Sequence, residues 1–175
     1  MTVIEIRPLT GDDAPAWRSI RLRMLTESPY SFGSTVEEFS RQTMDQVRER
    51  IAGRALEEGF QLGAFVDGAL LGTIGAYRGD SQRERHKMTI WGVYVAPEMR
   101  GQALARRLVS EAISRVRTIA GVEQVILWVA AHNDVARHVY EQAGFRAIGM
   151  EREALKFPDR YVDEHMMQLF LRDLT

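Results

Sequence analysis

One stretch of the sequence places small residues and an arginine where a predicted strand ends and a predicted helix begins. The segment VYVAPEMRGQALARRLVSEAI occupies residues 93–113. No Ser, Thr, Asp or Asn caps the helix, so its first backbone N–H groups lack side-chain partners. Its start reads Arg100-Gly101-Gln102-Ala103-Leu104-Ala105, where small residues leave the backbone open and Arg100 adds charge. This pattern predicts a phosphate or pyrophosphate site, although a sharp turn with hydrated amides fits it equally well.

A second stretch, residues 133–145, lies about 25 residues further along the chain. It reads Asn133-Asp134-Val135-Ala136-Arg137-His138-Val139-Tyr140-Glu141-Gln142-Ala143-Gly144-Phe145. The first stretch, over residues 93–108, resembles motif A of the GCN5-related N-acetyltransferases (GNAT), and the second resembles their motif B. Both motifs occur in the family's order and at its separation. The order of the predicted strands and helices extends the resemblance over nearly the whole chain.

The resemblance implies that acetyl-CoA is a co-substrate and lies between two parallel strands, here 88–97 and 124–130. The pyrophosphate is then held by the amides of residues 100–105, and the strand backbone near Val93 and Val95 faces the pantetheine arm and the thioester. Asn133 contacts the pantetheine arm, and Tyr140 protonates the departing thiolate. The cofactor-binding residues implied are Val93, Val95, Arg100, Gly101, Gln102, Ala103, Leu104, Ala105 and Asn133.

Ala103 departs from the family pattern, which is usually Arg/Gln-x-x-Gly-x-Gly/Ala. The first glycine of that pattern falls at Ala103. Alanine carries a Cβ where the phosphate approaches, and it resists a positive φ. Alanine is tolerated if the backbone is plain helix there, whereas a positive φ predicts weaker cofactor binding.

Acyl transfer to an amine needs a neutral amine, donors for the developing oxyanion, and a proton for the leaving sulfur. A backbone N–H near Val95 can serve the oxyanion, and Tyr140, with an ordinary pKa near 10, can serve the sulfur. The general base stays open among eight residues. These are Glu37, Glu38, Glu84, Glu151, Glu153, Asp163, Glu164 and His165.

Structural roles compete with these functional ones. Tyr140 could be a core aromatic residue bonded to a carbonyl, and Asn133 could simply cap a helix. Trp91 and Trp128 lie on the strands that border the predicted cofactor site, and we expect both to pack in the core. The four histidines lack the spacing and the partner ligands of a metal site, so we expect no metal.

The elements that must position these residues follow from hydrophobic periodicity and turn signals. Strands are predicted at 3–8, 88–97, 124–130, 145–150 and 161–171, and a hairpin at 60–79 turns at Asp67-Gly68, a pair typical of a type I′ turn. Helices are predicted after Thr10 or Asp12, over 35–56, after Arg100 and after Asn133. In the third helix Leu104, Leu108, Ala112, Ile113, Val116 and Ile119 form one apolar side.

These elements predict an α/β fold of GNAT type in a single domain over residues 1–175. Its centre is a mixed, mostly antiparallel sheet of about seven strands with helices on both faces. The segment from 88–97 through its helix to 124–130 predicts a parallel crossover, and the two parallel strands are expected to splay apart.

Composition narrows the function classes. The chain has no cysteine and a net charge of −1, which excludes thiol catalysis and argues against partnership with nucleic acid or a membrane surface. The start of the chain alternates like a strand and lacks the charged and apolar regions of a signal peptide, so a cytoplasmic location is expected.

The predicted function is transfer of acetyl from acetyl-CoA to a primary amine in a ternary complex. The preferred acceptor is a small molecule of the amino-acid type. The loop 27–34, the helix 35–56 and the loop 151–160 are expected to shape the acceptor pocket, and family resemblance suggests a homodimer. The alternatives are a non-catalytic acyl-CoA-binding sensor and a protein N-acetyltransferase. A dinucleotide-binding fold is disfavoured because no Gly-x-Gly-x-x-Gly follows the first strand.

Overall fold

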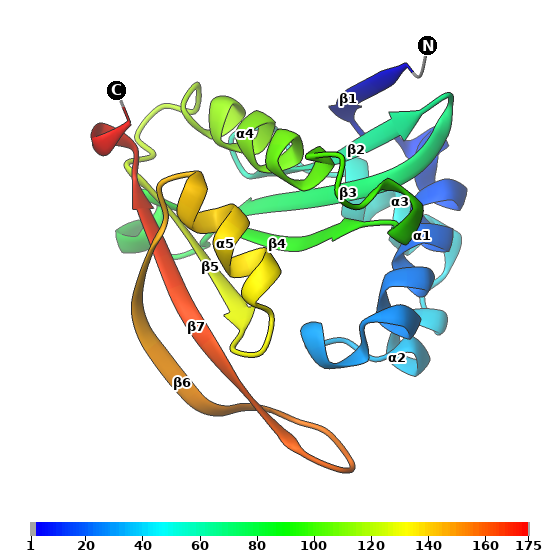
Figure 1. The fold of residues 1–175 in the computed structure, drawn as a ribbon. Helices are drawn as coiled ribbons and strands as arrows, with labels where there is room; N and C mark the ends of the chain where they lie inside the picture. The colour runs from blue at the N-terminus through cyan, green and yellow to red at the C-terminus, as the bar shows by residue number, and fades with distance from the viewer. Residues whose placement is uncertain (1–2, 175) are drawn as a thin grey trace.

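A twisted sheet of seven strands forms the centre of the computed structural model, which describes residues 3–174 (Figure 1). Its strands are β1 (Ile4–Pro8), β2 (Gly59–Val66), β3 (Ala69–Arg78), β4 (Lys87–Val95), β5 (Gln124–Ala130), β6 (Arg146–Lys156) and β7 (Tyr161–Phe170). They lie in the order β1-β2-β3-β4-β5-β7-β6, and every neighbouring pair is antiparallel except β4 with β5. The predicted mixed, mostly antiparallel sheet is confirmed.

Helices cover both faces of this sheet, as predicted. The α-helices are α1 (Ala14–Glu27), α2 (Val36–Ser40), α3 (Met44–Ala52), α4 (Leu104–Val116) and α5 (Asp134–Gln142). Short 3₁₀ helices are η1 (Gly11–Asp13), η2 (Pro29–Ser31), η3 (Gln82–Glu84), η4 (Pro97–Met99) and η5 (Leu171–Asp173). Among residues 3–174 no helix is both long and apolar enough to cross a membrane.

Two hydrophobic cores hold the layers together. On one face the apolar side of α4 packs with strand residues such as Leu62, Ile74 and Leu127, and α5 contributes Tyr140. On the other face α1 and α3 form a core around Trp17. The side chains predicted for the inner face of α4 are all buried, as the helical period requires.

The segment predicted as one helix over 35–56 is two helices, so that prediction was wrong. Thr35 caps α2 by accepting a hydrogen bond from the Glu38 amide at 3.1 Å, and Thr43 caps α3 by accepting one from the Gln46 amide at 3.3 Å. Each threonine thereby satisfies a free amide at a helix start, which favours a new helix over continuation of the first.

The two parallel strands separate after three residue pairs. Lys87, Met88 and Thr89 pair with Gln124, Val125 and Ile126, and no further β4–β5 pair forms in the described chain. Beyond Thr89, β4 follows β3 through a bulge at Gly92, where φ is +61°, whereas β5 stays paired with β7 along its whole length. The predicted splay therefore opens where the two strands follow different partners.

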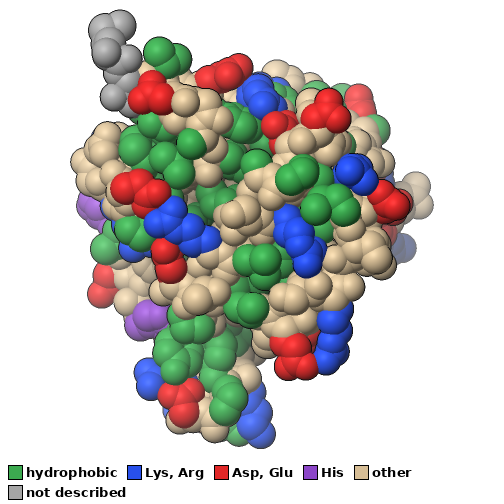
Figure 2. Space-filling view, turned by 90° about the vertical axis from the view of Figure 1, so that its right-hand side faces the viewer, with side chains coloured by type: hydrophobic (Ala, Val, Ile, Leu, Met, Phe, Trp, Pro, Cys, Tyr) green, Lys and Arg blue, Asp and Glu red, His purple; other side chains and the backbone are tan. Residues whose placement is uncertain are grey.

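The two β-hairpins differ in how well the sequence indicates them. Asp67 and Gly68 both have positive φ, 48° and 86°, which confirms the predicted type I′ turn between β2 and β3. The strand predicted at 145–150 extends instead through Lys156, with an irregular register at Glu153 (φ 54°). The β6–β7 hairpin projects from the body of the molecule (Figure 1) and forms the lower lobe in Figure 2.

Candidate functional site

The gap between β4 and β5 opens into a cavity of about 260 Å³, here called the splay cavity. Its walls are Arg21, Ser31, Phe32, Gly33, Ser34, Arg50, Tyr77, Thr89, Ile90, Trp91, Gly92, Val93, Leu127, Trp128, Val129, Ala130, Tyr140 and Glu164. Tyr140 comes from α5 on one face of the sheet, whereas Arg21 comes from α1 on the other. Groups from both faces therefore reach one space, which an unbroken sheet would prevent.

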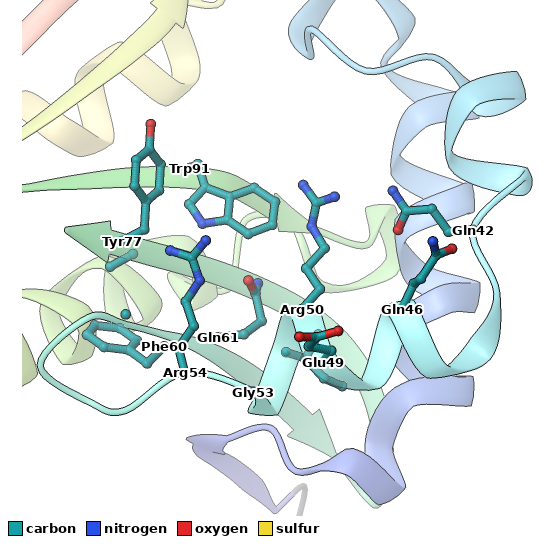
Figure 3. A pocket seen from close by; sticks show the side chains of 13 residues that line it. Gln42, Gln46, Glu49, Arg50, Gly53, Arg54, Phe60, Gln61, Tyr77 and Trp91 are labelled. Atoms are coloured by element: carbon teal, nitrogen blue, oxygen red, sulfur yellow. The ribbon is translucent and has the colours of Figure 1, made fainter. Parts of the chain in front are cut away.

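A larger cavity of about 730 Å³, the α3 cavity, adjoins it between α3 and the strands β2 to β4 (Figure 3). The two cavities share Arg50, Tyr77 and Trp91 as walls. In Figure 3, Arg50 and Arg54 extend toward Trp91 and Tyr77, and Gln42 and Gln46 stand on the far side. Together the two cavities have room for a small organic molecule.

The loop 27–34 was predicted to shape the acceptor pocket, and its residues Ser31–Ser34 do line the splay cavity. The segment 151–160 does not line either cavity. It holds the loop instead, because the Tyr30 hydroxyl lies 3.0 Å from an Asp159 carboxylate oxygen and the Tyr30 ring lies 5.0 Å from that of Phe157.

The helix after Arg100 begins only at Leu104, three residues later than the sequence suggested. Gly101 has φ +74°, and Ala103 lies in the left-handed region with φ 59° and ψ 13°. Ala103 is the N-cap of α4, and no side chain caps it. Alanine there is therefore strained by about 1–2 kcal/mol. The backbone at Ala103 is not plain helix.

The amides of residues 101–106 have no hydrogen-bond acceptor within residues 3–174. Gly101, Gln102 and Ala103 are exposed, and no heavy atom lies within 4 Å of the point where a Gly101 Cβ would stand. Leu104 is buried in the core, so only its amide can face a ligand. The segment is thus a set of open N–H donors at the positive end of α4.

Arg100 lies between the loop and the end of β4. Its Nε donates to the Val95 carbonyl at 3.1 Å, and its guanidinium lies 5.9 Å from the Tyr94 ring centre. The Ala96 amide donates to the Leu71 carbonyl on β3, and successive amides of a strand point to opposite edges. The Val95 amide therefore points toward the edge from which β5 has separated. Val93 lines the splay cavity.

Tyr140 is 6% exposed and lines the splay cavity, with its ring edge-on to Phe145 at 6.0 Å. Within the described chain its hydroxyl has no hydrogen-bond partner, and burial raises the pKa of the phenol. The phenol is therefore protonated at neutral pH. Of the two readings of Tyr140, the one with a hydroxyl bound to a carbonyl does not hold.

Asn133 caps α5, because its side-chain oxygen accepts a hydrogen bond from the Ala136 amide at 3.1 Å. This is the structural role that the sequence left open. Asn133 does not line either cavity, so contact with a pantetheine arm stays a prediction.

Of the eight candidate bases, Glu164 alone lines a cavity. It lies on β7 opposite Ala130, and burial, followed by the charge of Glu151, raises the pKa of its carboxyl. Glu37 forms an ion pair with Arg41, and Glu38 belongs to the cap of α2. The structure thus separates Glu164 from the other candidates, most of which face solvent.

Sequence analysis missed Arg21 and Arg50 as walls of the cavities. Arg21 is four residues after Trp17 and three before Met24, so it lies on the apolar side of α1. A charged residue in that position is a detectable signal, because burying an unpaired charge is costly.

The two tryptophans do not behave alike. Trp91 packs edge-on against Trp17 at 6.4 Å and also lines both cavities. Trp128 is 39% exposed, so the prediction that it packs in the core was wrong. It projects from β5 at the point where the neighbouring strand has left, which removes the surface it would have packed against.

Residues 3–174 contain no group of three or more His, Asp or Glu that could hold a metal ion.

Comparison with known proteins matches residues 20–145 to the model of the acetyltransferase (GNAT) family. A mycothiol acetyltransferase from Cellulomonas flavigena is 30% identical over 77% of this chain and 38% of its own length. A spermidine N(1)-acetyltransferase from Vibrio cholerae is 32% identical over 48% of this chain and 49% of its own length. The chain therefore spans less than half the length of these curated relatives.

Solved structures share the fold over nearly the whole chain. A GNAT-family acetyltransferase from Streptococcus pneumoniae superposes with a TM-score of 0.85 at 20% identity, covering 96% of this chain and 99% of that one. A putative acetyltransferase from Salmonella typhimurium, solved with its cofactor acetyl-CoA, gives a TM-score of 0.84 at 19% identity, covering 97% and 94%.

The left-handed backbone at Ala103 predicts that Ala103→Gly stabilises the protein. Glycine removes the Cβ strain, and the extra entropy it gives the unfolded chain offsets part of the gain, leaving about 0.5–1 kcal/mol in the free energy of unfolding. Denaturant titration measures this change. Ala105→Gly is the matched control, since it lies inside the first turn of α4 and should destabilise by about 0.5–1 kcal/mol. Equal losses in both variants would contradict the assignment.

Proposed function

Because this chain belongs to the acetyltransferase (GNAT) family, we propose that it moves the acetyl group of acetyl-CoA to a primary amine of a small molecule, by direct attack in a ternary complex. The observation that carries the proposal is the junction of β4 and α4. There a gap in the sheet lies beside a helix start whose first amides have no acceptor among residues 3–174. The single-domain organisation, the cytoplasmic location and the homodimer stay predictions.

The start of α4 is the proposed pyrophosphate site. The open amides of residues 101–105 can donate to phosphate oxygens, and Gly101 leaves room for the ligand to approach the backbone. Arg100 adds positive charge while its Nε stays on the Val95 carbonyl. Val93 and Val95 then face the pantetheine arm, and Asn133 offers it an amide N–H₂. Acetyl-CoA supplies the activated acyl group as a thioester.

Glu164 is the proposed general base. An amine is mostly protonated at neutral pH and must lose a proton before it can attack. A carboxylate whose pKa is raised by burial accepts that proton better than an ordinary one. Glu164 also lies on the wall of the cavity that Tyr140 reaches from the other face of the sheet.

Val95 and Tyr140 are the proposed groups for the later part of the reaction. The Val95 amide points toward the opened edge of β4, where it can donate to the carbonyl oxygen as negative charge develops. The protonated Tyr140 hydroxyl can then donate its proton to the leaving sulfur. Its lack of any other partner in the described chain leaves it free for this task.

The pyrophosphate site is tested with Gly101→Glu and, as its control, Gly101→Ala. Both variants carry a side chain at φ +74°, so they share the backbone strain, but only the first brings negative charge. We expect Gly101→Glu to bind acetyl-CoA at least about 10-fold more weakly than Gly101→Ala, because an anion repels the diphosphate. Calorimetric titration of acetyl-CoA measures both affinities. Equal affinities would place the diphosphate elsewhere.

Tyr140→Phe is expected to lower kcat by about 10²–10⁴-fold, because it removes the proton donor and keeps the ring. Acetyl-CoA affinity should stay the same. Thiol release with an accepted amine measures kcat, and Tyr161→Phe removes an exposed hydroxyl on the hairpin as the matched control. Unchanged turnover in Tyr140→Phe would exclude the residue as the acid.

The rate should depend on pH through Glu164. Its carboxyl must be deprotonated to act, and its raised pKa makes activity fall with acidification at a higher pH than for an ordinary glutamate. Glu164→Gln should remove most of kcat, and the remaining activity should no longer fall with acidification in this way. Glu151→Gln removes one cause of the raised pKa, so it should move the fall in activity to lower pH. A fall that stays in Glu164→Gln would assign the base to another group.

A further inference from the structure

A buried arginine on α1 has no carboxylate partner in the part of the chain that the structure describes. Arg21 is 4% exposed, and its Nε has no hydrogen-bond acceptor in the described chain. Its two side-chain hydrogen bonds are weak, one to the Met24 sulfur at 3.5 Å, a poor acceptor, and one to the Ser34 hydroxyl at 3.4 Å. A guanidinium carries five N–H donors, and leaving them unpaired inside a protein is costly. Burial, together with the charge of Arg50, lowers the pKa of Arg21 to about 10, so it is still charged at neutral pH.

A second arginine converges on the same indole. The guanidinium of Arg21 lies 5.4 Å from the Trp91 ring centre, and that of Arg50 lies 4.9 Å from it. Figure 3 shows Arg50 rising from α3 beside Trp91, into the space where the two cavities meet. Two positive charges that repel each other have therefore been brought to one wall.

Nearby acidic groups do not neutralise this pair. Glu49 lines the α3 cavity and Glu164 the splay cavity, but within residues 3–174 neither forms an ion pair with Arg21, Arg50 or Arg54 at 4.0 Å or less. Other arginines close to this segment do have partners, since Arg41 pairs with Glu37 and Arg48 with Asp45. Arg50 is exposed to solvent, so the buried Arg21 is the arginine for which a missing partner is costly.

We propose that the acceptor amine carries a carboxylate, and that Arg21 and Arg50 bind this carboxylate beside Trp91. The inference rests on the proposed function and names its acceptor class, an amino-acid-like compound. The amine of such a molecule then lies on the Glu164 and Tyr140 side of the cavity. The planar fork of a guanidinium matches the two oxygens of a carboxylate.

The same charges disfavour a cationic acceptor. A polyamine such as spermidine would bring further positive charge beside the buried Arg21 and the exposed Arg50, and like charges repel. The acceptor named for the Vibrio cholerae relative therefore does not suit this cavity.

The experiment compares matched amines with the full chain and acetyl-CoA. A panel of L-amino acids, their amides and spermidine is assayed by thiol release, and kcat/KM for the best amino acid should exceed that for its amide by about 100-fold or more. Aminoalkylphosphonates test whether the site binds a planar carboxylate. Phosphonates that react better than the matching carboxylates, or spermidine that reacts best, would overturn the proposal.

Variants test the two arginines. Arg21→Met should raise KM for the amino acid by about 10–100-fold and remove the preference over the amide. It should leave the unfolding temperature of the free protein unchanged or higher, because a buried unpaired charge is replaced by an apolar chain of similar length. A lower unfolding temperature with intact preference would make Arg21 a structural residue. Arg50→Gln is the second variant, and Arg41→Gln is the control, because Arg41 is an exposed arginine directly after α2.

Binding without turnover separates this inference from the proposed function. Near saturation, the amino acid alone should raise the unfolding temperature by about 5 °C in the wild type and not in Arg21→Met, and its amide should not. Acetyl-CoA alone is the second arm. If the amino acid raises the unfolding temperature but acetyl-CoA does not, the proposed acetyl transfer is contradicted and the proposed carboxylate site is supported. If acetyl-CoA binds and no amino acid binds, the proposed carboxylate site is contradicted.

Discussion

The structure depends on the loss of hydrogen bonding between β4 and β5. Three residue pairs join the strands, and beyond Thr89 each strand follows a different partner, β3 on one side and β7 on the other. A buried strand edge without a partner is unfavourable, so a break of this kind persists only where surrounding elements enforce it. Here the bulge at Gly92 and the continuous β5–β7 ladder do so. The gap gives the sheet a passage from one face to the other.

Because of this passage, the two helical layers contribute different chemical groups to the same space. The layer of α4 and α5 presents open amides and a phenol, and the layer of α1 and α3 presents arginines and a larger hollow. In the proposed reaction, acetyl-CoA would approach from the α4 and α5 layer and the amine from the α1 and α3 layer, so they would not compete for the same space. Many acceptors can be served by changing α1 to α3 while the α4 side stays fixed, because the two layers have separate cores.

Local patterns predicted the parts of the fold that depend on local chemistry. The apolar side of α4 follows from spacing alone, and Asp67-Gly68 follows from the backbone of a type I′ turn. The division of 35–56 was also readable, since Thr35-x-x-Glu38 and Thr43-x-x-Gln46 are capping boxes. The sequence could not single out Glu164 among the candidate bases, because that choice requires knowing that β7 lies beside β5. The left-handed backbone at Ala103 was left open, because only the glycine of the family pattern hints at a positive φ there and alanine itself gives no sign of one.

All three tryptophans of the chain lie at the splay cavity or next to it. Trp91 and Trp128 line the splay cavity, and Trp17 touches Trp91 edge-on. Two guanidinium charges lie against the Trp91 ring, and an anion bound there would change the electric field across the indole. The wavelength and intensity of the protein's intrinsic tryptophan fluorescence would then report occupancy of the cavity, with no label attached.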